Sequence, residues 1–173
     1  MLLWFRQLWR QRVQAARAVH ASVKPQYTFV VFVDFDGVLH PGTTGTMRLV
    51  ALLEEFLAAY PFVVVVISSN WRISESLESL RGWFSPEFAS RIIGVTPIMP
   101  DSPGSRQAEI ELWLAQHIVQ AWCALDDDVR LFRPGCPWLI LTDNRTGLSA
   151  ENLKAMAAML SAFVQPNTAA NYG

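Results

Sequence analysis

The chain has 173 residues, of which 51% are apolar and 17% charged. This composition is typical of one globular domain with a sizeable core and excludes a largely disordered protein. Residues 1–33 hold five basic residues and no acid, so the remainder carries 15 acids against nine bases, or −6 within a net charge of −1. That sign argues against a broad nucleic-acid-binding face, so an anionic ligand would need a metal ion and a few local arginines.

The first 26 residues predict a basic amphipathic helix. Leu2, Phe5, Trp9 and Val13 recur at helical spacing with arginines between them, a pattern that favours peripheral contact with an anionic membrane surface or a protein partner through residues 1–20. The alternative is a helix packed on its own domain, or a poorly ordered leader. Arg6 interrupts the apolar run, so the segment does not read as a secretory signal.

Five short apolar runs follow, alternating with amphipathic helical patterns. The runs cover residues 27–33, 62–67, 92–95, 121–125 and 138–142, and the helical faces lie within residues 49–60, 110–118 and 153–164. Continuous runs of this kind are typical of strands buried on both faces. We therefore predict an α/β domain over residues 27–164, with a doubly wound, three-layer parallel sheet in the order 5-4-1-2-3, and a frayed tail over residues 165–173.

Two cysteines are too few to suggest a disulfide framework or a zinc site. Cys123 lies in an apolar run and Cys136 in a Pro-Gly-Cys-Pro turn. We expect Cys123 to be a buried structural thiol, and the reducing cytoplasm to be the location of the protein.

Acidic and hydroxyl side chains follow four of the five predicted strands. They form the segments Asp34-Phe-Asp36-Gly37, Ser68-Ser69-Asn70, Asp126-Asp127-Asp128 and Thr142-Asp143. Ligands of a doubly wound sheet collect beyond the carboxyl ends of its strands, so these side chains should meet there. Several carboxylates buried together raise one another's pKa unless a cation intervenes. We predict a Mg²⁺ site formed by acids from this set, namely Asp34, Asp36, Asp126 and Asp127.

With a metal ion in place, Asp34 can attack a phosphoryl group to give an aspartyl-phosphate. Asp36, two residues on, can protonate the leaving oxygen and then deprotonate the attacking water. Substrate contacts are predicted for Ser68, Ser69, Asn70, Arg72 and Arg106. Arg106 is the preferred cation for transition-state charge, with Arg72 as the competitor, and either serine can hold phosphoryl oxygens.

At these residues the chain resembles the haloacid dehalogenase (HAD) superfamily of phosphohydrolases. Four segments carry the resemblance in order: FVVFVDFDGVLHP, VVVVISSNWR, SRQAEIELWL and WCALDDDVRLF. Together with the late Thr142-Asp-x-x-x-Gly-Leu, they are similar to the HAD domain of Swiss Army Knife RNA repair proteins. The resemblance implies a Mg²⁺-dependent phosphatase with Asp34 as the nucleophile, acting on phosphorylated RNA or DNA ends.

The spacing of these segments leaves no room for a folded cap domain, because 34 positions separate Asp34 from Ser68 and 38 separate Ser68 from Arg106. We expect an open site with a short flap over residues 40–46, where His40 either touches substrate or is structural. Trp71 either stacks on a base or closes the core. The two rival interpretations are a metal-independent dehalogenase-type hydrolase, against which Asp36 argues, and a non-catalytic binding module that keeps the fold.

Overall fold

The computed structural model describes residues 26–164, so the helix predicted for the N-terminal segment and the tail at 165–173 lie outside the described residues. Within the described part, no helix is both long and apolar enough to cross a membrane. The elements in chain order are β1 (Tyr27–Val33), α2 (Val50–Ala58), β2 (Val63–Ile67), η1 (Asn70–Ile73), α3 (Leu77–Arg81), α4 (Pro86–Ala89), β3 (Ile92–Val95), α5 (Ser105–Leu114), β4 (Val119–Asp126), η2 (Val129–Leu131), β5 (Leu139–Leu141) and α6 (Ala150–Val164).

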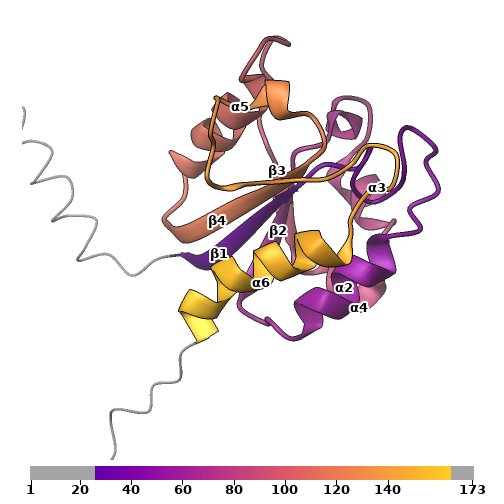
Figure 1. Cartoon of the computed structure of the whole chain (residues 1–173), viewed down its shortest axis with the longest axis vertical. Helices are drawn as coiled ribbons and strands as arrows, with labels where there is room; N and C mark the ends of the chain where they lie inside the picture. Colours follow the sequence, from indigo (N-terminus) through magenta and orange to yellow (C-terminus); the bar gives the residue numbers. More distant parts are fainter. Residues whose placement is uncertain (1–25, 165–173) are drawn as a thin grey trace, which may run out of the picture.

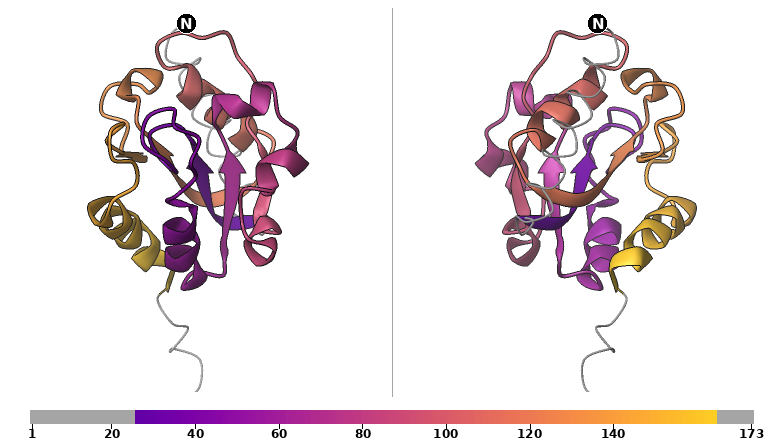
Figure 2. Two further views of the ribbon diagram at one scale, coloured as in Figure 1. Left: turned by 90° about the vertical axis from the view of Figure 1, so that its right-hand side faces the viewer. Right: turned by 90° about the vertical axis from the view of Figure 1, so that its left-hand side faces the viewer.

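The strands form one parallel sheet in the order β3-β2-β1-β4-β5, which confirms the order predicted from the sequence. β1 is central and pairs with β2 and β4 along its length, as the end-on views of Figure 2 show. Its run of valines and phenylalanines is buried on both faces, as expected for a strand with helices above and below it.

Helices cover both faces of this sheet (Figure 1). On one face, Phe29, Val31 and Val33 of β1 pack in a core that includes residues of α2, α3, α4 and α6. On the other face, Val30 and Phe32 pack with residues of α5. Because successive side chains of a strand point to opposite faces, the even-numbered residues of β1 face α5.

The second predicted helical face, within residues 110–118, is shorter than the sequence pattern suggested. α5 ends at Leu114, and the following amides of Gln116 and His117 donate to carbonyls three residues back, which tightens the chain into a turn. The His117 ring stacks on Trp113 with the ring centroids 3.7 Å apart. The histidine therefore packs against the helix, although it lies beyond its end.

Residues 34–49, between β1 and α2, form a loop rather than an inserted domain. The segment between β2 and β3 holds only the short elements η1, α3 and α4. No cap domain is therefore present within residues 26–164, in agreement with the spacing of the sequence motifs.

Candidate active site

The candidate site begins just past the ends of three strands, where hydrogen bonds between the neighbouring backbones continue. The amide of Ser68 donates to Val33 (2.9 Å), and the amide of Asp34 donates to Leu125 (3.0 Å). The register pairs Val33 with both Ile67 and Leu125, so Asp34, Ser68 and Asp126 form the next row across three strands. Residues at one register point to the same face, and here it is the face that α5 covers.

Three carboxylates meet at this row. Asp34, Asp126 and Asp127 each offer an oxygen, and these oxygens all lie within 4.8 Å of one another. Asp34 and Asp126 are buried, whereas Asp127 is partly exposed. The predicted meeting of acids from distant parts of the sequence is therefore found, and this group could hold a metal ion.

Arg106 places a guanidinium beside two of these acids. Its Nη1 atom lies 2.9 Å from Oδ2 of Asp126 and 3.3 Å from Oδ2 of Asp34. Burial alone would lower the pKa of Arg106, but the carboxylates of Asp34, Asp126 and Glu109 together raise it above its ordinary value. The arginine is thus fully charged, and it lies in the first turn of α5, as the sequence predicted.

Glu109, to which the sequence interpretation gave no role, joins the two buried arginines. Its Oε2 atom lies 2.5 Å from Nη2 of Arg72 and 3.6 Å from Nε of Arg106, and its Oε1 atom accepts from the amide of Met99 (3.0 Å). The signal available in the sequence was an acid three positions after Arg106, on the helix face that the apolar residue Ile110 also marks as buried.

The guanidinium of Arg72 is directed into the protein. It donates to the carbonyls of Ser68 (2.6 Å), Ser69 (2.8 Å) and Thr96 (3.1 Å), as well as to the carboxylate of Glu109. Burial lowers its pKa, and the charge of Glu109 opposes that effect. These contacts fix the ends of β2 and β3. Of the two predicted transition-state cations, Arg106 is the one that lies against Asp34 and Asp126.

The acids are left short of positive charge. Within residues 26–164, the ion pairs of Asp34, Asp126 and Glu109 are all with the guanidinium groups of Arg72 and Arg106, and Asp127 adds a fourth carboxylate. Burial, followed by the charge of Asp34, raises the pKa of Asp126 to about 8, and burial also raises the pKa of Asp127. Two uncompensated negative charges on oxygen ligands match a divalent cation such as Mg²⁺, so the donor set fits the predicted metal.

Asp36 lies apart from this group of three. Its Oδ2 atom accepts from the indole Nε1 of Trp71 (2.9 Å), and its Oδ1 atom lies 3.5 Å from Nε2 of His40. The side chain of Asp36 keeps 31% of its surface exposed, whereas that of His40 is fully buried. The amide of Gly45 donates to Nδ1 of His40 (3.4 Å), and the same nitrogen lies 3.5 Å from the carbonyl oxygen of Pro41.

The turn after Asp36 fits closely against the group of three acids. Gly37 has φ +65, and a Cβ atom at this position would lie 2.3 Å from Oδ2 of Asp127. Its carbonyl accepts from the hydroxyl of Thr142 (2.7 Å), and the side-chain amide of Asn144 donates to Asp127. The contacts of Thr142 and Asn144 were not foreseen, because a polar residue after the last strand does not reveal its partner.

The two adjacent serines have different surroundings. The hydroxyl of Ser69 accepts from the amide of Trp71 and caps η1. The hydroxyl of Ser68 is buried in the row of Asp34 and has no hydrogen-bond partner among the described residues. Asn70 is exposed, and its Oδ1 atom accepts weakly from both Arg72 and Arg106 (3.4 Å each). Ser68 is therefore the serine available for a ligand.

The sheet order, the two aspartates after the central strand and the acids after β4 define a domain of the HAD type. Residues 30–153, well over half of the chain, match the family described as the HAD domain in Swiss Army Knife RNA repair proteins. The chain belongs to this family. No curated protein and no solved structure gives a significant match.

Proposed function

We propose that this protein is a Mg²⁺-dependent phosphomonoesterase that uses Asp34 as its nucleophile. The observation that carries the proposal is the group of Asp34, Asp126 and Asp127, of which the first two are buried and whose oxygens lie within 4.8 Å of one another beside Arg106. Members of the HAD superfamily are typically phosphohydrolases, which is the class of chemistry that this group of side chains suits. When bound there, Mg²⁺ would neutralise carboxylate and phosphoryl charge.

In the first step, an Oδ atom of Asp34 attacks phosphorus and the bond from phosphorus to the leaving oxygen breaks. Asp36 transfers a proton to that oxygen, so the alcohol leaves neutral. Water then attacks the aspartyl-phosphate, the bond between Asp34 and phosphorus breaks, and Asp36 takes a proton from the water. The balance is one water consumed for one alcohol and one inorganic phosphate released.

The phosphoryl oxygens need hydrogen-bond donors or cations that offset their negative charge. The unpartnered hydroxyl of Ser68 and the guanidinium of Arg106 are the groups that we assign to this role. Ser69, Asn70 and Arg72 support these two groups. Ser69 caps η1, and Arg72 donates hydrogen bonds to the backbone carbonyls that follow β2. Asp36 is the fourth member of the predicted metal set. Its carboxylate accepts a hydrogen bond from Trp71, so its contact with the metal ion is a further part of our proposal.

The substrate that we propose is a phosphorylated end of RNA or DNA. The family description, which refers to RNA repair, and the absence of a cap domain within residues 26–164 support it. An open site admits the end of a polymer, whereas a capped site encloses a small molecule. This step rests on family analogy, so it requires its own test.

The test compares the wild type with Asp34→Asn on a generic aryl phosphate and on 3′- and 5′-phosphorylated oligonucleotides, with Mg²⁺ and with a chelator. We expect turnover only by the wild type with Mg²⁺. Turnover that is unchanged by the chelator would contradict the dependence on Mg²⁺, and no turnover of any ester would contradict the assignment as a phosphomonoesterase. Turnover of small esters with every oligonucleotide untouched would contradict the assignment to nucleic-acid ends.

A further inference from the structure

A cleft opens beside the phosphoryl site, on the side of Arg106. It has a volume of about 250 Å³, and its lining includes the polar side chains of Asn70, Ser105 and Arg106. Three apolar side chains, Ile73, Met99 and Leu131, line the same cleft. Arg106, which lines this cleft, also contacts Asp34 and Asp126, so one side chain connects the cleft with the place assigned to the phosphate.

The apolar wall is unusually exposed for side chains of this type. Ile73 keeps 60% of its surface accessible, and Met99 is exposed as well. Ile98, next in the chain to Met99, is also exposed. A group of exposed apolar residues at the rim of a polar site marks a ligand-binding surface. The group attached to the phosphate should therefore present an apolar face to this wall.

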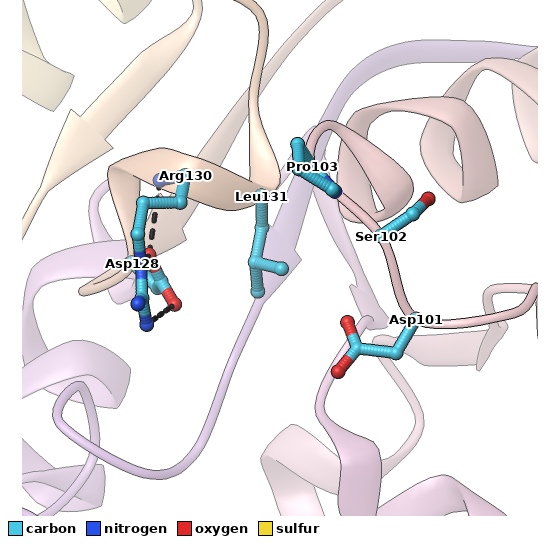
Figure 3. A pocket seen from close by; sticks show the side chains of 6 residues that line it. All are labelled: Asp101, Ser102, Pro103, Asp128, Arg130 and Leu131. Carbon is cyan, nitrogen blue, oxygen red and sulfur yellow. Dashed lines mark hydrogen bonds and ion pairs between the residues drawn. The ribbon is translucent and has the colours of Figure 1, made fainter.

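The surroundings of Asp101 and Leu131, which line the cleft, carry excess negative charge. A second cavity of about 260 Å³ shares Asp101 and Leu131 with the first and is also lined by Asp128 and Arg130. Figure 3 shows Leu131 between the Asp128–Arg130 ion pair and Asp101. Two carboxylates here face one guanidinium, so a second phosphate group would be repelled, whereas a neutral ring with hydrogen-bond donors on its edge would be accepted.

We propose that this cleft binds the nucleobase of the nucleotide whose phosphate lies at Asp34, an inference that rests on the proposed function. A base has apolar faces for Ile73, Met99 and Leu131, and a polar edge for Asn70, Ser105 and Asp101. A sugar phosphate would place hydroxyl groups against the apolar wall. The phenyl ring of a phosphotyrosine has no polar edge for the acidic rim.

The test uses Ile73→Ser and Met99→Ser, which alter exposed side chains, and Leu112→Ser as the matched control. Leu112 is exposed on α5 but lines neither cavity. For each variant, kcat/KM is measured for a phosphorylated dinucleotide, for glycerol phosphate and for a phosphotyrosyl peptide. We expect the ratio of dinucleotide to glycerol phosphate to fall about tenfold in the two cleft variants and to stay at the wild-type value in the control.

An unchanged ratio in both cleft variants would overturn the proposal, as would a wild type that prefers the phosphotyrosyl peptide. If no ester is turned over, the proposed function fails, but the cleft is still decided by equilibrium binding of the dinucleotide in the presence of Mg²⁺. Binding weakened in Ile73→Ser and not in Leu112→Ser supports the cleft. Equal binding by the two variants, or no binding by the wild type, contradicts it.

Discussion

Glu109 lies 2.5 Å from Arg72 and holds it beside Arg106, so one carboxylate separates two buried guanidinium groups. Removing its charge would leave two buried cations that repel each other. We predict that Glu109→Gln lowers the free energy of unfolding by about 3 to 5 kcal/mol, as expected when a buried ion pair loses one partner. Urea denaturation measures this change.

The matched control is Glu111→Gln, two residues along the same helix. Glu111 pairs with Arg133 at 2.7 Å, but both side chains are largely exposed, so its loss should cost at most about 1 kcal/mol. Equal destabilisation by the two variants would show that Glu109 is an ordinary surface partner.

Gly37→Ala should abolish Mg²⁺-dependent turnover. The new Cβ atom would lie 2.3 Å from Oδ2 of Asp127 at a backbone φ of +65, so the turn and the carboxylate cannot both keep their places. Gly135→Ala is the control that measures the cost of backbone strain alone, because Gly135 has φ +74 and no atom lies within 4 Å of an added Cβ. We expect the control to lose about 1 to 2 kcal/mol of stability with its activity kept. An active Gly37→Ala enzyme would refute the close fit.

Stabilisation by Mg²⁺ should increase with pH. Burial raises the pKa of Asp126 in the folded state to about 8. Without metal, the protonated carboxyl therefore stabilises the fold most at a pH below its ordinary pKa, and this stabilisation is lost as the pH rises towards 8. Mg²⁺ binds the ionised form, so the rise in Tm on adding it should be small near pH 5 and large near pH 8. Thermal melts with and without Mg²⁺ measure it. A metal-induced shift that is constant with pH, or retained in Asp126→Asn, would argue against this coupling.

Trp71→Phe should slow substrates with poor leaving groups. The indole Nε1 holds Asp36 at 2.9 Å, and Asp36 is the proposed proton donor. Without that hydrogen bond we expect kcat for an alkyl phosphate to fall about tenfold, and for an aryl phosphate by less, since its leaving group needs less help from an acid. Trp83→Phe is the control, because Trp83 packs edge-on against Trp71 but does not contact Asp36. Equal losses for both substrates would assign Trp71 a packing role only.

The sequence predicted the sheet and its order because each predicted strand is a continuous apolar run and each crossover has one favoured hand. It also predicted that Asp34 would meet Asp126 and Asp127, since the carboxyl ends of parallel strands share one edge. The role of Glu109 could not be read in the same way. An acid within a helix is most often solvated, and only the folded arrangement shows that it faces Arg72.

The choice between Ser68 and Ser69 also needed the structure. Both follow β2 and both are buried. They differ because Ser69 uses its hydroxyl to cap η1, while the register places Ser68 in the row of Asp34. A shift of one residue in register would exchange the faces to which the two serines point. The sequence pattern alone therefore does not determine which serine hydroxyl lies beside Asp34.

The central claim is that Asp34 bonds to phosphorus. Wild type mixed with an aryl phosphate and Mg²⁺, quenched in acid within a single turnover and digested, should yield a peptide containing residue 34 that is heavier by one phosphoryl group, with the mass on Asp34. The same peptide from Asp34→Asn should be unmodified. Turnover that releases phosphate while Asp34 stays unmodified at every quench time, or while Asp34→Asn keeps wild-type activity, would contradict the account.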